Sequence, residues 1–129
     1  MNANEISLLE AFHNTFFNFT EDLKKLTWDA SEIWQWANFP YIAGDLQYSI
    51  LNGGEYVLRC AGEFLNKSDR TNITLFLDKV ASLPDDALRA NEDALDHPRW
   101  KELRRDARDL LEQLERPITE NRAFFAKPA

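Results

Sequence analysis

The sequence contains one cysteine, two histidines, four glycines and five prolines among its 129 residues. A lone cysteine, Cys60, cannot form an intrachain disulfide or the thiolate cluster of a structural zinc site. So few glycines and prolines are also unlike a turn-rich β-sandwich or a low-complexity linker. What remains is a globular chain whose fold depends on its apolar side chains, which make up 44% of the residues.

Long apolar runs are missing as well, since the longest spans only a few residues and a bilayer requires about 20. The first residues, Met1–Glu5, have neither the basic start nor the apolar stretch of a secretory signal peptide. Together with the single cysteine, these features predict a cytoplasmic protein that does not bind membranes.

Positive charge is in short supply. The chain has 22 acidic and 15 basic residues, for a net charge of −7, and residues 1–66 hold 9 of the acids but only 3 of the bases. Such a surface repels phosphate backbones, so we do not expect nucleic acid as a partner. It would instead attract a basic protein surface.

Apolar residues recur every three or four positions, which is the spacing of one face of an α-helix. The clearest stripe comes first: Leu9, Phe12, Phe16, Phe19, Leu23 and Leu26. Similar or weaker helical patterns follow over 29–38, 41–51, 57–65, 73–83, 84–95 and 100–114. The sequence therefore predicts an all-α fold, a compact single-domain bundle of about five to six helices.

Several residues mark the expected helix ends. Asn52-Gly53-Gly54 is the clearest turn signal in the chain, with Cys60 buried in the helix that follows it. Ser68 or Asp69 is expected to cap the next helix. Pro117 is expected to end the last helix of the domain, so that the domain would span residues 1–117.

The remaining residues, 118–129, form a C-terminal tail that we expect to pack back on the domain. Its Phe124-Phe125 pair would then cover the aromatic segment at 28–41. The alternative is that this pair docks into a groove on another chain. Packing back is favoured because two exposed phenylalanines promote association.

The usual signatures of catalysis and metal binding do not occur. The chain has no H-E-x-x-H, no cysteine pair, no G-x-S-x-G and no phosphate-binding loop. His13 borders the first apolar stripe, where a partly exposed structural histidine is more common than a catalytic base. We therefore expect no catalytic, cofactor-binding or metal-ligating residues, no cofactor and no enzyme activity.

Two surfaces are candidates for binding a partner. The first combines aromatic anchors with acidic steering residues and consists of Trp34, Trp36, Tyr41, Glu32, Asp45 and Asp29. The second and weaker candidate is the basic flank of the last helix, formed by Lys101, Arg104, Arg105 and Arg108. Phe124 and Phe125 are further weak candidates.

The function we expect is protein–protein binding by a small acidic protein. A more specific form is an inhibitor that masks a basic surface of its target. In size and charge alone, with no shared motif, the chain is similar to bacterial immunity proteins and phage-encoded inhibitors. Two alternatives remain: a homodimeric structural or accessory subunit, and a small helical enzyme or ligand-binding domain with its pocket near Trp34, Trp36, Tyr41 and His13.

Overall fold

The computed structural model describes residues 3–28, 32–33, 42–89 and 92–126. Its α-helices are α1 (Ala3–Leu26), α3 (Ile42–Cys60), α4 (Lys67–Ala81), α5 (Pro98–Gln113) and α6 (Glu115–Ala126). Short 3-10 turns are η1 (Gly62–Phe64), η2 (Asp85–Ala87) and η3 (Glu92–Asp96). These ranges contain no strand, and the predicted all-α fold is confirmed.

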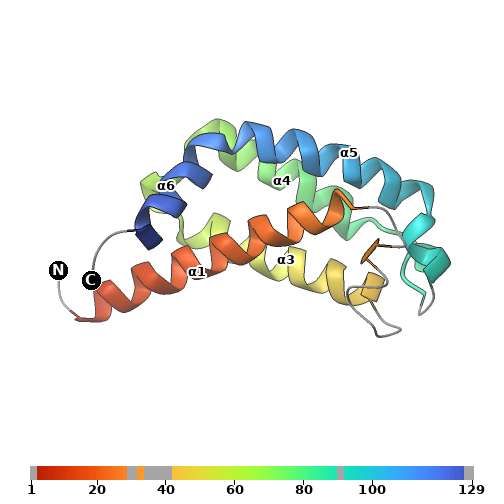
Figure 1. Ribbon diagram of the computed structural model, residues 1–129, viewed down its shortest axis with the longest axis horizontal. Helices are drawn as coiled ribbons and strands as arrows, with labels where there is room; N and C mark the ends of the chain where they lie inside the picture. Colours follow the sequence, from red (N-terminus) through yellow and green to blue (C-terminus); the bar gives the residue numbers. More distant parts are fainter. Residues whose placement is uncertain (1–2, 29–31, 34–41, 90–91, 127–129) are drawn as a thin grey trace.

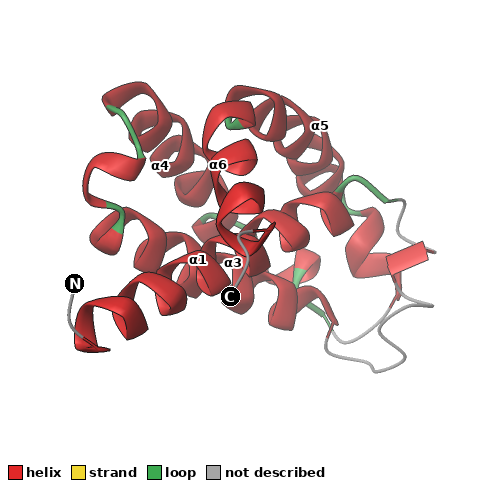
Figure 2. Ribbon diagram, turned by 60° about the vertical axis from the view of Figure 1, so that its left-hand side comes forward, coloured by secondary structure: helices red, strands yellow, loops and turns green. Residues whose placement is uncertain are grey.

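Helices α1, α3, α4 and α5 form an up-and-down bundle in which successive helices run antiparallel (Figure 1). Each contacts the next along the chain, and α1 also contacts α5, which closes the ring. Helix α6 turns back across the end of the bundle where α1 begins and contacts both α1 and α5. Short connections join α3 to α4 and α5 to α6 (Figure 2).

The predicted stripe of α1 supplies much of the core. Phe16, Phe19, Leu23 and Leu26 are at most 1% exposed, and burying a side chain of this size stabilises the fold by about 1.5–3 kcal/mol. Leu9, expected in the same stripe, is 38% exposed. The first turns of α1 project beyond the rest of the bundle (Figure 1).

The turn predicted at Asn52-Gly53-Gly54 is wrong, because α3 runs through all three residues without a break. Gly54 is buried, and a Cβ atom placed on it would lie 2.6 Å from Cδ2 of Leu77 on α4. Gly53 faces α1, where its Cβ would lie 3.7 Å from Cβ of Phe19. The glycine pair therefore serves close helix packing and not chain reversal.

The residue that caps the start of α4 is not one of the two that were predicted. Asn66 is the N-cap, since its side-chain oxygen accepts a hydrogen bond of 2.8 Å from the Asp69 backbone N–H. The Asp69 carboxylate accepts from the Asn66 N–H in return, which completes a capping box. Arg116 of α6 donates to the same carboxylate at 2.8 Å and to the Phe64 carbonyl at 2.9 Å. This arginine therefore ties the first turn of α6 to α4 and η1.

The weak helix predicted over 84–95 is replaced by the two 3-10 turns η2 and η3. These turns pack over Trp100, which is 1% exposed and donates from its indole nitrogen to the Ala87 carbonyl at 2.7 Å. His97 caps α5, because its Nδ1 accepts from the Arg99 N–H at 3.1 Å. His97 therefore stands at the start of the last bundle helix.

Pro117 does not stop α5. That helix ends at Gln113, and α6 begins two residues later, so Pro117 is buried in the first turn of α6. A proline is tolerated there because first-turn N–H groups have no partner within the helix. Most of the tail expected at 118–129 is thus the body of a helix that extends to Ala126.

Candidate functional site

Large apolar side chains are exposed at the end of the molecule where α1 begins. Leu8 is 67% exposed and Phe17 is 43% exposed on α1, and Phe125 of α6 is 46% exposed. Phe17 and Phe125 touch edge to face, with ring centroids 5.9 Å apart. Together with Leu9, these residues are here named the α1 apolar surface.

Three hollows accompany this surface. The first, of about 420 Å³, lies between the start of α1 and the end of α3 and is lined by Leu8, Leu9, Phe12, His13, Tyr56, Cys60, Ala61 and Phe64. The second, of about 350 Å³, shares Leu9, His13 and Phe64 with the first and adds Glu120, Ala123 and Phe124. The third, of about 370 Å³, lies by Phe17 and Phe125. The first two hollows adjoin each other, whereas the third shares no lining residue with either of them.

Aromatic side chains that pack against one another form a rigid wall behind these hollows. Phe64 of η1 packs edge to face on Phe12 and Phe16, at centroid distances of 5.1 and 5.2 Å. Phe124 stacks on His13 with centroids 4.0 Å apart and an angle of 9° between the planes. Residues from α1, η1 and α6 therefore build one preformed aromatic wall.

His13 is buried, at 6% exposure, so the expectation of partial exposure is wrong. The reason is α6, which covers the imidazole with Phe124 and places Asn121 beside it. The Asn121 amide nitrogen lies 2.9 Å from His13 Nδ1 and donates to the His13 carbonyl at 3.0 Å. Sequence reasoning missed this contact because the two residues are 108 positions apart.

Cys60 is exposed, contrary to its predicted burial. The prediction placed it in the middle of a helix, but it is the last residue of α3, where the chain turns into η1. Its side chain lines the first hollow beside Tyr56.

Most of the predicted aromatic and acidic binding surface lies outside the described residues, namely Asp29, Trp34, Trp36 and Tyr41. Of the remainder, Glu32 and Asp45 are both exposed. Tyr48 follows Asp45 by one helical turn and is 72% exposed, which the sequence analysis did not single out. The proposed pocket of Trp34, Trp36, Tyr41 and His13 also falls largely outside the described residues.

The basic flank of α5 is partly engaged within the fold. Arg104 donates to the Leu95 carbonyl at 2.8 Å, and Arg108 donates to the Thr27 carbonyl at 3.1 Å. Arg108 thereby places a positive charge just beyond the carboxyl end of α1, where the helix dipole favours it. Lys101 and Arg105 are exposed. Two of the four predicted residues therefore contribute to the fold.

Phe124 and Phe125 pack back on the domain, and apart from the contact between their own two rings their described ring contacts are with α1. Phe124 stacks on His13, and Phe125 contacts both Phe17 and the His13 ring. Most of the predicted target, the segment at 28–41, lies outside the described residues.

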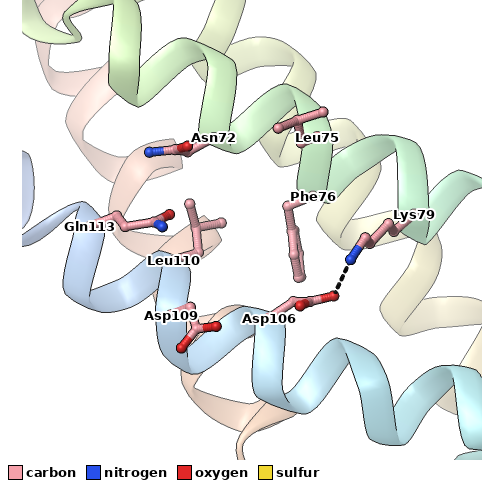
Figure 3. Close-up of a pocket in the computed structure, with 8 residues that line it drawn as sticks. All are labelled: Asn72, Leu75, Phe76, Lys79, Asp106, Asp109, Leu110 and Gln113. Carbon is pink, nitrogen blue, oxygen red and sulfur yellow. Dashed lines mark hydrogen bonds and ion pairs between the residues drawn. The ribbon is translucent and has the colours of Figure 1, made fainter.

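A polar cleft of about 160 Å³ separates α4 from α5 (Figure 3). Lys79 donates across it to Asp106 at 2.9 Å and to Glu102 at 3.4 Å. The hydrogen bond to Asp106 is the largest cause of a raised pKa for Lys79. The cleft is smaller than the roughly 300 Å³ typical of a ligand pocket. We interpret it as an interhelical ion-pair seam.

One carboxylate on α1 is affected by burial. Asp22 accepts a hydrogen bond of 2.6 Å from the Ser49 hydroxyl of α3. Burial raises the pKa of Asp22 above its ordinary value of 3.8, although the Ser49 bond and Lys25 act in the opposite direction. The folded chain therefore binds this proton more tightly than the unfolded chain does, and ionisation at neutral pH costs stability.

Asp22→Asn is accordingly expected to increase the free energy of unfolding at pH 7, since the amide still accepts from Ser49 and carries no charge. At pH 3 the wild-type carboxyl is itself mostly protonated, so the gain should disappear. Urea titrations at the two pH values measure the difference, with Glu21→Gln as the neighbouring control. A gain of equal size at pH 3 would show that burial of the charge is not the cause.

No group of three or more histidine, cysteine, aspartate or glutamate side chains in the described parts of the chain could hold a metal ion. None of the described helices is long and apolar enough to cross a membrane. Comparison of the chain with protein-family models, curated proteins and solved structures finds no match. Its function is therefore inferred from its own residues.

Proposed function

We propose that the chain acts by binding another protein, and that the α1 apolar surface is the contact. The observation that carries this proposal is the exposure of Leu8 and Leu9 beside the first two hollows, together with that of Phe17 and Phe125 beside the third. Exposed apolar side chains grouped around a concave, rigid wall are typical of protein interfaces.

The hollows suit a helix or an extended segment that presents a few apolar anchors. Leu8 alone exposes two thirds of its surface, and burying a leucine contributes about 1.5–3 kcal/mol before the cost of association is subtracted. The aromatic wall behind it, built by Phe12 and Phe64, is already packed. Little reorganisation is then required when a partner binds.

Charge indicates the chemistry of the partner. The first 66 residues carry 9 acids and 3 bases, and on the described helices Glu10, Asp45 and Glu55 are exposed. A partner whose apolar anchors are flanked by lysine or arginine would be steered toward this half of the chain. Masking such a basic surface, as an inhibitor does, is the more specific form of the proposal.

A second copy of the chain is the competing occupant of the same surface. Each copy carries a net charge of −7, so pairing two acidic halves would be opposed by repulsion. Sedimentation equilibrium decides between the two occupants: the proposal predicts a monomer at micromolar concentration. A stable dimer that dissociates in Leu8→Asp would instead favour the homodimeric subunit.

Leu8→Asp tests the contact directly. An amphipathic helical peptide of about 18 residues, with leucine on one face and lysine on the other, serves as the probe. We expect Leu8→Asp to weaken its binding by at least about tenfold, since a charge would be placed against apolar anchors. Titration calorimetry measures the affinity, and stopped-flow mixing should show association slowing as salt is added.

Leu75→Asp is the matched control. Leu75 is another exposed leucine, at 58%, but it lies on α4 beside the polar cleft. Neither substitution replaces a buried side chain, so both variants should fold. Equal weakening by both substitutions would mean that the loss of affinity does not depend on where the aspartate is placed, and it would refute the proposed contact.

A further inference from the structure

We infer that the third hollow captures the last residue of a partner chain: Phe17 and Phe125 hold its aromatic side chain, and Arg122 binds its free carboxylate. This inference goes beyond the proposed function, because the third hollow shares no lining residue with the first two and requires no contact with Leu8. The ligand it names is the carboxyl end of a polypeptide that finishes in an aromatic residue.

The third hollow is built by two helices, each of which contributes a polar residue and, one turn later, a phenylalanine. Asn14 and Phe17 come from α1, whereas Arg122 and Phe125 come from α6. The two rings meet edge to face at an angle of 74°, and they are still 43% and 46% exposed. A third ring packed against them would extend the cluster in a geometry that aromatic side chains prefer. With a volume of about 370 Å³, the hollow has room for such a side chain.

Arg122 supplies the positive charge of this hollow. It is exposed, and it makes no hydrogen bond or ion pair with any residue that the structure describes. Glu120, the acid nearest to it in the sequence, pairs instead with Arg116 at 3.1 Å. The residues one turn away on α6 carry no negative charge; they are Ile118, Thr119, Phe125 and Ala126. A guanidinium in this position is suited to a carboxylate, which it can bind through two parallel hydrogen bonds.

The closeness of the rings and the charge favours a chain end over an internal acidic residue. Only four residues line the hollow, so the ligand must present its ring and its carboxylate together. Inside a partner segment these two groups belong to different residues, whereas the last residue of a chain carries both on one Cα atom. The Asn14 amide, which makes no hydrogen bond to the described parts of the chain, is placed to donate to the preceding peptide carbonyl.

A fourth hollow gives the preceding residues of the partner chain a place to lie. It has a volume of about 390 Å³, is formed by α1, α5 and α6, and has Arg122 in its lining as well. Leu111 and Ile118 give it apolar walls. Its exposed Glu112 and Glu115 offer acceptors for the N–H groups of an extended backbone. A polypeptide can use both hollows, which a free aromatic acid cannot.

The probe is the acetylated pentapeptide Gly-Ser-Gly-Ser-Phe, which ends in either a free carboxylate or a carboxamide. Amide chemical shifts in NMR spectra of the isotope-labelled full chain measure both affinities. We expect the acid to bind about fivefold more tightly than the amide, as an exposed charge pair allows. The shifts should fall on residues 14–17 and 122–125, and added salt should reduce the difference between the two peptides.

Arg122→Gln should lower the affinity of the acid to that of the amide and leave the amide unaffected. Arg105→Gln is the matched control, because it removes an exposed arginine of α5 that lines none of the four hollows. This variant should keep the full preference for the acid. Leu8→Asp should keep it too, so the capture of a chain end and the proposed function can fail separately.

Equal binding of acid and amide to the wild type, or no shift of residues 14–17 and 122–125 at millimolar peptide, would overturn the inference. So would an equal loss of preference in Arg105→Gln. Acetylphenylalanine that binds as tightly as the pentapeptide would assign the hollow to a free aromatic acid and would also contradict a chain end. If Arg122→Gln fails to fold, the comparison of acid with amide in the wild type still decides.

Discussion

Trp100→Ala is expected to lower the free energy of unfolding by about 3–5 kcal/mol, which is the usual cost of truncating a fully buried tryptophan. Trp100 is 1% exposed and joins α5 to the 3-10 turns before it. The substitution empties this volume and also leaves the Ala87 carbonyl without the indole N–H that now donates to it at 2.7 Å. Urea unfolding followed by circular dichroism measures the loss.

Trp100→Phe separates the two contributions. It keeps much of the ring volume but removes the donor, so we expect a loss of about 1–3 kcal/mol, the cost of an unsatisfied buried acceptor together with a small cavity. A loss below about 1 kcal/mol for Trp100→Ala would mean that the 3-10 turns and α5 are not packed around this indole.

Gly54→Val is expected to destabilise the fold by about 1–3 kcal/mol, the usual cost of overpacking a core. The new side chain would begin 2.6 Å from Leu77 Cδ2 and 3.1 Å from Leu77 Cγ, so the buried Leu77 side chain would have to shift within the packed contact between α3 and α4. Leu77→Ala removes the clashing atoms. The loss of unfolding free energy in the double variant should therefore be smaller than the sum of the losses in the two single variants, by at least about 0.5 kcal/mol.

Gly53→Ala is the matched control on the adjacent residue. Its Cβ meets only ordinary contacts with Phe19, so the variant should be more stable by up to about 1 kcal/mol, the difference in helix propensity. If Asn52-Gly53-Gly54 were instead a turn with positive φ, the same alanine would destabilise the chain. Thermal and urea unfolding of both variants would reveal such a reversal.

Helical periodicity was sufficient to predict the fold class because each bundle helix buries one stripe. The stripe residues of α1 from Phe12 onward lie in the core as predicted, as do Trp100, Leu103, Ala107 and Leu110 of α5 and Leu114 just after it. Glycine was the ambiguous signal. Local sequence cannot distinguish a glycine pair that reverses the chain from one that lets two helices approach, because the difference depends on Leu77 in another helix.

The site was harder to predict for the same reason. Leu9 belongs to an apolar stripe that predicts burial, but it is 38% exposed beside the first two hollows, and Leu8, which lies outside that stripe, is 67% exposed. His13 is buried by α6, a helix that the sequence presents as an aperiodic tail after a proline. Charge was more informative: it indicated an acidic first half, on which the proposed choice of partner still depends.

The most direct test of binding at the α1 apolar surface is amide hydrogen exchange on the complex of the chain with the leucine–lysine peptide. The account predicts that protection appears in α1 before Phe17, at the end of α3 and in α6, and is lost in Leu8→Asp. Protection confined to the other end of the bundle, around Asp45 and Tyr48, or no local protection at all, would contradict it.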